Sequence, residues 1–383
     1  MTTLRGMPAG DMLLEGVSPV RPVTIAGAGP AGLTAAIILA RAGWPVTVYE
    51  RHAAVGGHFR NDLRGLENWA DHEDALVLFR SCGLSINFDA IPFRDLTVLA
   101  GTDGEHHFHC DRPAFFLIRR GAEQGCLDHG LAEQARECGV ALRCGETLAP
   151  HAADIVATGT LHRHHFAAAA GETFRTDHPD IACGLLDNAA ADKGYAYLLV
   201  AGGHGCLCTV FFDRFDLVQA GYALAKQRLL ARFPVAMKDP RPFGGVGGFL
   251  LESCFVEKGR LRVGEAAGLQ DMLWGFGLKG AVVSGFLAAQ SLINGTDYAA
   301  AARARFSGRQ QASLANRYLW ERFAGRGYQR FLRRIRRARD PLAWLASFYN
   351  LNRLHRMVYP FAVAVLAGRY RLHHDGTTQD GRP

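Results

Sequence analysis

The 383-residue sequence predicts an α/β protein. A Rossmann-like domain is assembled from separated stretches of chain, a β-rich domain is interleaved with it, and a helical segment follows. Three observations predict this fold. A strand–glycine turn–helix–strand unit occurs early, a second glycine-rich turn before an apolar helix comes more than 200 residues later, and strand-like sequences lie between them. Hydrophobic residues (49%) and charged residues (21%) occur in globular proportions, which excludes a wholly disordered chain.

The first unit contains a G-x-G-x-x-G turn. Residues 22–26 form a short apolar run typical of a buried parallel strand, and residues 33–42 form an apolar helix. The turn between them reads Gly27-Ala28-Gly29-Pro30-Ala31-Gly32. In such a turn Gly27 permits the tight bend, Gly29 lets the backbone approach a pyrophosphate, and Gly32 lets the helix pack closely on the strand. We include Pro30 and Ala31 in the predicted site, because a helix N-terminus favours phosphate groups.

A second strand, residues 46–49, ends on an acid. Glu50 follows Gly32 by 18 residues, where a carboxylate can accept hydrogen bonds from both ribose hydroxyls. Arg51 comes next and is included in the site. Two strands, a helix and an acid in register favour a nucleotide site over a chance glycine-rich turn.

A second motif distinguishes FAD from NAD. Residues 261–268 run from a strand into a turn with Gly264 and Glu265, and Gly275-Phe276-Gly277 precedes an apolar helix at 278–292. Such a distal motif is typical of flavoproteins, in which the acid binds a ribityl hydroxyl. The helix N-terminus then faces the flavin pyrimidine ring and stabilises its anionic reduced form. Since extended FAD spans a domain built from both segments, the sequence predicts FAD.

Residues 23–292 resemble the flavoprotein group that includes geranylgeranyl reductases, aromatic hydroxylases and flavin-dependent halogenases, and the geranylgeranyl reductase branch resembles them most. Besides the two motifs, residues 116–131 and the strand 154–159 carry the resemblance. It implies a GR2-type FAD domain in which Arg119 or Arg120 contacts the FAD phosphates. It also implies that Arg60 lies near the flavin or its diphosphate, and that Gly159 ends the strand returning to the nucleotide.

The sequence departs from this family at two places. Glu265 stands where the family usually has Asp, which keeps the carboxylate. Thr158-Gly159 stands where aromatic hydroxylases have an Asp-Gly pair tied to NAD(P)H binding, and this favours a reductase over a monooxygenase. No second G-x-G-x-x-G occurs, so we expect the electrons to come from transiently bound NAD(P)H or from a reduced electron-carrier protein.

The candidate catalytic residues are Tyr195, Tyr197 and Trp274. Residues 194–200 alternate aromatics onto one strand face and resemble the strand that lines the substrate cavity in the reductase and halogenase branches, although an ordinary amphipathic strand has the same pattern. Residues 206–211 would be its hairpin partner. Trp274 and its apolar neighbours would stand at the flavin edge, which suits an apolar or conjugated substrate. Either tyrosine could protonate or orient that substrate.

The sequence predicts no metal site. Among 16 His, the clusters at 106–109 and 162–165 lack helical i, i+4 pairing and Cys-x-x-Cys neighbours. The nine Cys also lack Cys-x-x-Cys spacing, and we expect reduced thiols in a cytoplasmic protein. No apolar run is long enough to span a membrane.

The net charge of +7 is unevenly distributed. Residues 303–371 hold 16 Arg against two acids and carry +14, whereas residues 1–302 carry −6. We expect a helix at 317–338, with an apolar stripe at Leu319, Phe323, Phe331 and Ile335, and a second helix at 342–349. This segment could cap the acidic body, contact an anionic membrane surface peripherally, or bind an acidic partner protein. No nucleic-acid platform is apparent.

The predicted function is hydride transfer between FAD and a C=C bond of an apolar, isoprenoid- or polyketide-like substrate. The alternatives are an FAD monooxygenase that hydroxylates an aromatic or polyketide-like substrate, and a non-catalytic flavin-containing binding protein. The oligomeric state stays open. The predicted division is a flexible N-terminus (1–20), an FAD-binding domain (21–82, 110–170, 255–300), a substrate domain (83–109, 171–254), a basic helical region (301–371) and a flexible tail (372–383).

Overall fold

The structure is a computed structural model that describes residues 21–71, 73–101, 104–159, 166–323 and 327–376. The predicted flexible N-terminus and the histidine cluster at 162–165 lie outside these residues. Residues 372–376 of the predicted tail belong to the helix α9 (Arg353–Gly376), and residues 377–383 lie outside the described ranges. A helix that has formed gains one hydrogen bond with each residue it adds, and no proline interrupts residues 361–376.

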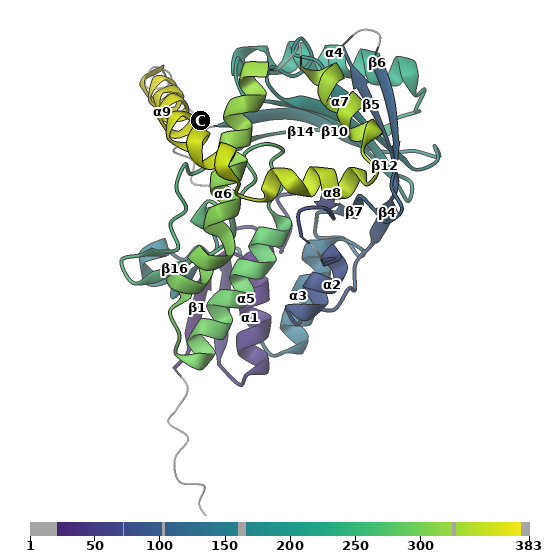
Figure 1. Ribbon diagram of the computed structural model, residues 1–383. Helices are drawn as coiled ribbons and strands as arrows, with labels where there is room; N and C mark the ends of the chain where they lie inside the picture. Colours follow the sequence, from purple (N-terminus) through teal and green to yellow (C-terminus); the bar gives the residue numbers. More distant parts are fainter. Residues whose placement is uncertain (1–20, 72, 102–103, 160–165, 324–326, 377–383) are drawn as a thin grey trace, which may run out of the picture.

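A six-stranded sheet of Rossmann type forms one part of the molecule, as predicted (Figure 1). Its order is β15-β16-β9-β1-β2-β8, and all neighbouring strands are parallel except β15 and β16. The strands are β1 (Val23–Ala26), β2 (Val46–Glu50), β8 (Ala141–Cys144), β9 (Ile155–Val156), β15 (Val256–Glu257) and β16 (Arg260–Arg262). The helices α1 (Pro30–Arg41), α3 (Leu127–Glu137) and α5 (Leu278–Asn294) pack beside it, and α1 contacts both others. Burial by these helices explains the apolar composition of β1.

A seven-stranded sheet forms the second part, in the order β14-β10-β13-β12-β11-β5-β6. Its strands are β5 (Asp95–Ala100), β6 (Gly104–His109), β10 (Ala167–Arg175), β11 (Ile181–Leu186), β12 (Tyr195–Ala201), β13 (His204–Phe211) and β14 (Lys238–Gly247). The predicted hairpin is confirmed, because β12 and β13 pair antiparallel with Tyr197 opposite Cys208. The domain boundary that we predicted at residues 170–171 falls inside β10, since Ala167–Ala170 already pair within this sheet.

The helix α4 (Val218–Arg232) decides which face of β12 is available. Ala196, Leu198 and Val200 pack against Ala225 and Leu229 of α4 in one buried core. Since side chains alternate along a strand, the intervening residues of β12 point to the opposite face. The two tyrosines are therefore directed away from α4.

A three-stranded sheet joins the two parts. It consists of β3 (Leu63–Glu67), β7 (Phe115–Arg119) and β4 (Ala90–Phe93), and the helix α2 (Ala75–Ser81) follows β3. β3 contacts both β12 and β13 of the seven-stranded sheet. Stretches of chain that we assigned to different domains therefore share one sheet and one buried core, which includes Leu63, Phe93 and Cys206.

The C-terminal helices are α6 (Tyr298–Phe323), α7 (Tyr328–Arg337), α8 (Pro341–Ala346) and α9. The single helix predicted at 317–338 is wrong, because α6 ends at Phe323 and α7 begins only after its N-cap Gly327. Glycine disfavours a helix interior, and the sequence has Gly325 and Gly327 at this point. The start of α8 is as expected: Asp340 accepts hydrogen bonds from the N–H groups of Leu342 and Ala343.

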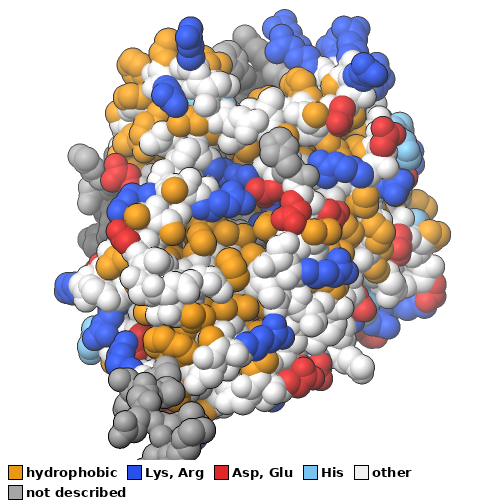
Figure 2. Space-filling model, turned by 60° about the horizontal axis from the view of Figure 1, so that its bottom comes forward, with side chains coloured by type: hydrophobic (Ala, Val, Ile, Leu, Met, Phe, Trp, Pro, Cys, Tyr) orange, Lys and Arg blue, Asp and Glu red, His pale blue; other side chains and the backbone are white. Residues whose placement is uncertain are grey.

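Part of the basic segment packs on the body. Tyr328, Leu332 and Ile335 of α7 share a buried core with Val98 and Phe108 of the seven-stranded sheet. On the face shown in Figure 2, basic and acidic side chains are interspersed rather than separated by sign. The apolar side of α7 is therefore explained by its packing on the seven-stranded sheet.

Candidate functional site

One cavity of about 1290 Å³ connects the β1–α1 turn to the exposed face of β12. It is lined by nearly all of the predicted site residues: Gly27, Gly29, Pro30, Ala31, Glu50, Arg51, Arg60, Arg120, Gly159, Tyr195, Tyr197, Gly264, Glu265, Trp274, Gly275, Phe276 and Gly277. Gly32 and Arg119 are the two predicted residues that do not line it. Residues scattered over most of the chain thus meet in a single space.

The three glycines of the dinucleotide turn, residues 27–32, have different surroundings. Gly27 has φ +103, and a Cβ there would lie 2.3 Å from the carbonyl oxygen of Ala157. A Cβ on Gly32 would lie 2.1 Å from the carbonyl oxygen of Gly27. A Cβ on Gly29 would have nothing within 4 Å, and Gly29 lines the cavity. Gly27 and Gly32 are therefore required for packing, whereas Gly29 leaves open space in front of the α1 N-terminus.

Glu50 is held by backbone groups at the end of β2. Its Oε2 accepts a hydrogen bond from the N–H of Ala28 (3.1 Å), and its Oε1 accepts one from the N–H of His52 (3.0 Å). The carboxylate is thus fixed beside the dinucleotide turn, at the mouth of the same cavity. Further lone pairs remain on its oxygens for ligand hydroxyls.

The structure separates the two adjacent arginines that follow β7. Arg120 lines the cavity, pairs with Asp128 through Nε and Nη2 (2.8 Å each), and lies 4.1 Å from the centre of the Phe59 ring. Arg119 instead donates to Asp89 Oδ2 (2.7 Å) and to the carbonyl of Gln124 (2.9 Å), outside the cavity. Successive residues of an extended chain point to opposite sides, so only one of the two can face the cavity. Arg120 is therefore the arginine of this pair that can reach a ligand there.

The distal motif, residues 264–277, reaches the same cavity from the other end of the chain. The N–H of Gly264 donates to Ser284 Oγ of α5 (2.9 Å), and a Cβ on Gly264 would lie 3.0 Å from the Cβ of Ala31. Glu265 stands close to both Gly159 and Gly277, since a Cβ on either would lie 3.9 Å from a Glu265 carboxylate oxygen. Gly277 is the N-cap of α5 and has no side-chain cap. Two helix N-termini therefore face one cavity.

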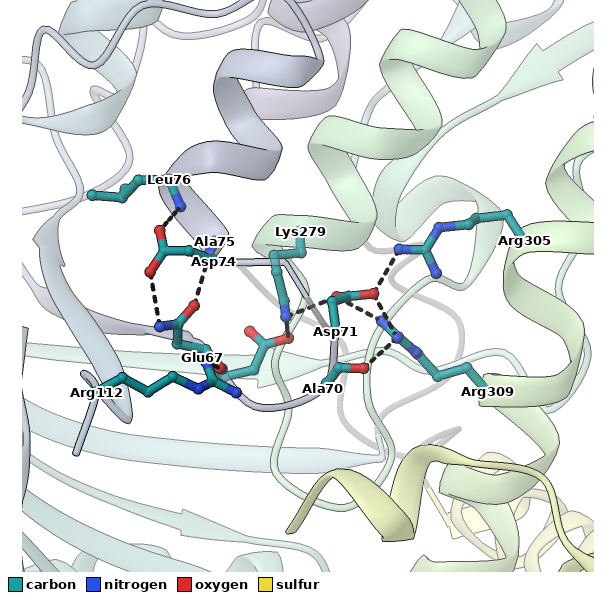
Figure 3. A network of polar contacts seen from close by, with 11 residues as sticks. Glu67, Ala70, Asp71, Asp74, Ala75, Leu76, Arg112, Lys279, Arg305 and Arg309 are labelled. Atoms are coloured by element: carbon teal, nitrogen blue, oxygen red, sulfur yellow. Dashed lines mark hydrogen bonds and ion pairs between the residues drawn. The ribbon is translucent and has the colours of Figure 1, made fainter. Parts of the chain in front are cut away.

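A buried ion network fixes the first turn of α5 (Figure 3). Lys279 is 3% exposed, and its Nζ lies 3.0 Å from Glu67 and 2.9 Å from Asp71. Asp71 also pairs with Arg305 and Arg309 of α6. Burial raises the pKa of Glu67. Burial would also raise the pKa of Asp71, but the hydrogen bond from Arg309 and the charge of Lys279 outweigh it and lower that pKa. No spacing in the sequence indicates this network, because its members are neighbours only in the folded chain.

The two tyrosines of β12 face the cavity. The Tyr195 hydroxyl donates to the carbonyl of Trp274, and the Tyr197 oxygen accepts a hydrogen bond from Arg64 Nη1 (3.1 Å). Burial raises the pKa of both hydroxyls well above the ordinary value for tyrosine, so both stay protonated. Arg64, on β3, was not predicted as a site residue. The feature of the sequence that could have indicated it is a basic residue between apolar positions of a strand.

Apolar side chains form the rest of this end of the cavity, which we call the chamber. Its walls include Phe115, Phe243 and Trp274, and α7 and α8 close it with Phe331 and Leu342. The C-terminal helices are therefore part of the site. Within the described ranges of the chain, no group of three or more His, Cys, Asp or Glu could hold a metal ion. Among the same residues, no helix is both long and apolar enough to cross a membrane.

The sequence comparisons with known proteins match short stretches of the chain. The family model of the NAD(P)-binding Rossmann-like domain matches residues 25–75. YgfK of Escherichia coli strain K12 is 60% identical over 40 residues, which make up 10% of this chain and 4% of YgfK. The chain thus corresponds to a small fraction of that relative's length, and the match supports the Rossmann-like turn alone.

Similarity to solved structures covers nearly the whole chain. The geranylgeranyl bacteriochlorophyll reductase-like protein of Thermoplasma acidophilum gives a TM-score of 0.63 at 17% identity, covering 91% of this chain and 98% of that one. The flavin-dependent brominase Bmp2 gives 0.63 at 16%, with 91% and 98% covered. The p-nitrophenol 4-monooxygenase PnpA of Pseudomonas putida DLL-E4 gives 0.52 at 16%, with 89% and 97% covered. The chain therefore has the fold of the FAD-dependent oxidoreductases that include geranylgeranyl reductase-like proteins, flavin-dependent halogenases and monooxygenases.

Proposed function

We propose that the cavity binds FAD. The residues fit an extended dinucleotide: open space at Gly29 before the α1 N-terminus, a fixed carboxylate at Glu50, and the α5 N-terminus with Glu265 at the distal motif. Phosphates favour the positive end of a helix, and ribose hydroxyls favour a carboxylate. In this arrangement the dinucleotide turn and Glu50 hold the adenosine half, while Glu265 and the start of α5 lie on the flavin half.

The proposed reaction is hydride transfer to a C=C bond of an apolar substrate. When bound, the flavin supplies the hydride chemistry. One observation carries this proposal: the cofactor space and the apolar chamber are parts of a single cavity, so a substrate in the chamber meets the cofactor without crossing solvent. Trp274 and Tyr195 shape the chamber, and Tyr197 keeps a proton within it. NAD(P)H or a reduced carrier protein would supply the electrons.

Anaerobic reoxidation of the reduced protein tests this reaction. The purified protein is first assayed for bound FAD by absorbance and mass spectrometry, and the flavin is then reduced chemically without oxygen. We expect reoxidation on addition of an unsaturated isoprenoid, with a product heavier by two hydrogens. Reoxidation by oxygen alone, with hydroxylation of an added aromatic compound, would instead support a monooxygenase. Bound FAD that no donor reduces would support a binding protein.

We also propose that α9 contacts an anionic membrane surface. Leu354, Met357, Phe361 and Val365 are between 48% and 63% exposed and lie on one stripe of the helix. An adjacent side of α9 is buried, and the helix contacts α6. Exposed arginines at 353 and 356 adjoin this stripe on the same helix. An apolar stripe beside basic side chains is complementary to the interface of a negatively charged bilayer.

Vesicle co-sedimentation tests the membrane contact. The double variant Met357→Ser/Phe361→Ser should bind phosphatidylserine-containing vesicles roughly 100-fold more weakly than the wild type, because two apolar side chains no longer enter the interface. The matched control is Val77→Ser/Val256→Ser, which removes apolar side chains that are 44% and 40% exposed elsewhere. Equal binding by both double variants, or no wild-type binding, would contradict the proposal.

A further inference from the structure

Arg64 and its partner Asp62 bring charge to the otherwise apolar walls of the chamber. Arg64 reaches from β3 towards the faces of β12 and β14, with its guanidinium 5.8 Å from the Phe243 ring centre and 3.1 Å from the Tyr197 oxygen. Its Nη2 donates to Asp62 (2.7 Å). Desolvating a guanidinium is costly, so a cation here calls for an explanation.

The contacts that Arg64 makes within the protein do not use all of its N–H groups. A guanidinium has five N–H groups, and among the described residues that of Arg64 makes two hydrogen bonds, to Tyr197 and to Asp62. More than a third of its side chain (36%) is accessible, although it lines the cavity rather than the outer surface. Further donors are therefore available to a ligand inside the chamber.

Arg64 also orients the hydroxyl of Tyr197. Because the Tyr197 oxygen accepts from Arg64, its own O–H is directed elsewhere. The Tyr197 side chain also forms a hydrogen bond with the adjacent thiol of Cys208, which is neutral because burial raises its pKa to about 11. A thiol is a weak acceptor, so a ligand oxygen can take its place as the partner of the Tyr197 O–H. Tyr197 and Arg64 thus offer an O–H and N–H groups to the same region of the chamber.

We propose that Arg64 and Tyr197 form an oxyanion-binding pair, and that the substrate is an apolar compound whose C=C bond is conjugated with a carbonyl group. This inference rests on the proposed hydride transfer and names its substrate class. Hydride addition to an isolated C=C bond leaves the electron pair on carbon. Hydride addition to the β carbon of an enone or enal instead moves the pair through the α carbon to the carbonyl oxygen, which becomes an enolate oxygen.

The pair would then stabilise this developing charge. Tyr197 O–H and Arg64 N–H donate to the enolate oxygen, and a proton from water adds to the α carbon, so that one hydride and one proton complete the reduction of the C=C bond. Asp62 neutralises Arg64 before the substrate binds, which limits the cost of holding the cation in the chamber. Donors directed at a developing oxyanion contribute about 10²-fold to 10³-fold each to the rate.

Two probes with one carbon skeleton test the proposal. Citral has an aldehyde conjugated with its C=C bond, and geraniol has an alcohol in place of the aldehyde. With FAD-loaded protein reduced anaerobically, we expect citral to reoxidise the flavin and yield citronellal, and geraniol to react at least about 100-fold more slowly. Arg64→Leu and Tyr197→Phe should each slow the citral reaction by about 10²-fold to 10³-fold without loss of FAD, and Arg64→Lys should restore part of the rate. The matched control is Arg175→Leu, which removes an exposed arginine of β10.

Binding to the oxidised protein separates this inference from the proposed reaction. Citral should bind more tightly than geraniol, and Arg64→Leu should abolish that difference. Equal reduction of both probes would leave the hydride transfer standing and overturn the carbonyl requirement. Retained binding selectivity without any reoxidation would support the oxygen-binding pair and overturn the reaction. Unchanged selectivity in Arg64→Leu and in the isosteric Tyr197→Phe would overturn the pair in either case.

Discussion

Gly29→Thr should purify as a folded protein with almost no FAD. The backbone of Gly29 has φ −77 and ψ 177, which any residue adopts, and threonine is tolerated at a helix N-cap. Its side chain would enter open cavity space and cover the N–H groups at the start of α1. Losing two charge-assisted hydrogen bonds to a phosphate corresponds to about 10²-fold to 10⁴-fold weaker binding. Flavin absorbance of the purified protein and titration of the apoprotein with FAD measure this loss.

Gly27→Ala is the informative counterpart, because it should damage the fold instead. Its Cβ would collide with the backbone oxygen of Ala157, and φ +103 is unfavourable for alanine. We expect a loss of roughly 3 kcal/mol in the free energy of unfolding and a melting temperature lower by roughly 10 °C in the apoprotein. If Gly29→Thr retained FAD at the wild-type level, the cofactor site would not lie at this turn. If both variants unfolded alike, Gly29 would have a packing role.

Lys279→Met should be the most destabilising single substitution outside the glycine turns. Methionine fills a similar volume but leaves the Glu67 carboxylate buried without its cation. Removing one partner of a buried ion pair costs about 3–5 kcal/mol in the free energy of unfolding. Lys226→Met is the control: its ion pair with Glu172 is 34% exposed on the lysine side, and such a pair contributes about 1 kcal/mol or less. Urea unfolding measures the free energy of unfolding of each variant relative to that of the wild-type apoprotein.

The pH dependence of the stability of Lys279→Met tests whether Glu67 is the group that destabilises this variant. Burial already raises the pKa of Glu67 in the wild type, and loss of the ammonium raises it further. The folded state then binds a proton more readily than the unfolded state, so stability falls as pH rises from the unfolded pKa of about 4.3 towards the raised folded pKa. Acidification within this window should partly restore the variant, and Lys279→Met/Glu67→Gln should recover stability at neutral pH. A loss of stability that is independent of pH would instead indicate a packing defect.

The end of the cavity at the dinucleotide turn could be predicted largely from the sequence. Gly27 and Gly264 have positive φ in their turns, and Glu50 ends the strand β2. These features depend on neighbouring residues, so they can be recognised in the order of the chain. Arg119 and Arg120 show what a sequence motif leaves undecided. Two adjacent arginines in a motif look equivalent, whereas strand alternation directs only Arg120 to the cavity.

The network around Lys279 and the Arg64–Tyr197 pair could not be predicted in this way. Their members come from β3, β12, α5 and α6, and no spacing in the chain relates Lys279 to Glu67 or Arg64 to Tyr197. The C-terminal segment is intermediate. Its charge and the apolar stripe with Phe331 and Ile335 were evident in the sequence, whereas the break between α6 and α7 and the strands against which Ile335 packs were not.

By itself, the sequence determined the Rossmann-like turn, the distal motif and the hairpin of β12 and β13, because turns, helix starts and alternation depend on neighbouring residues. Only the tertiary structure decided that these motifs line one cavity, that α7 and α8 close it, and that Arg64 stands inside it. The physical reason is that burial and ion pairing depend on which surfaces meet. A buried cation is stable only where the fold brings an acid or another hydrogen-bond acceptor to it.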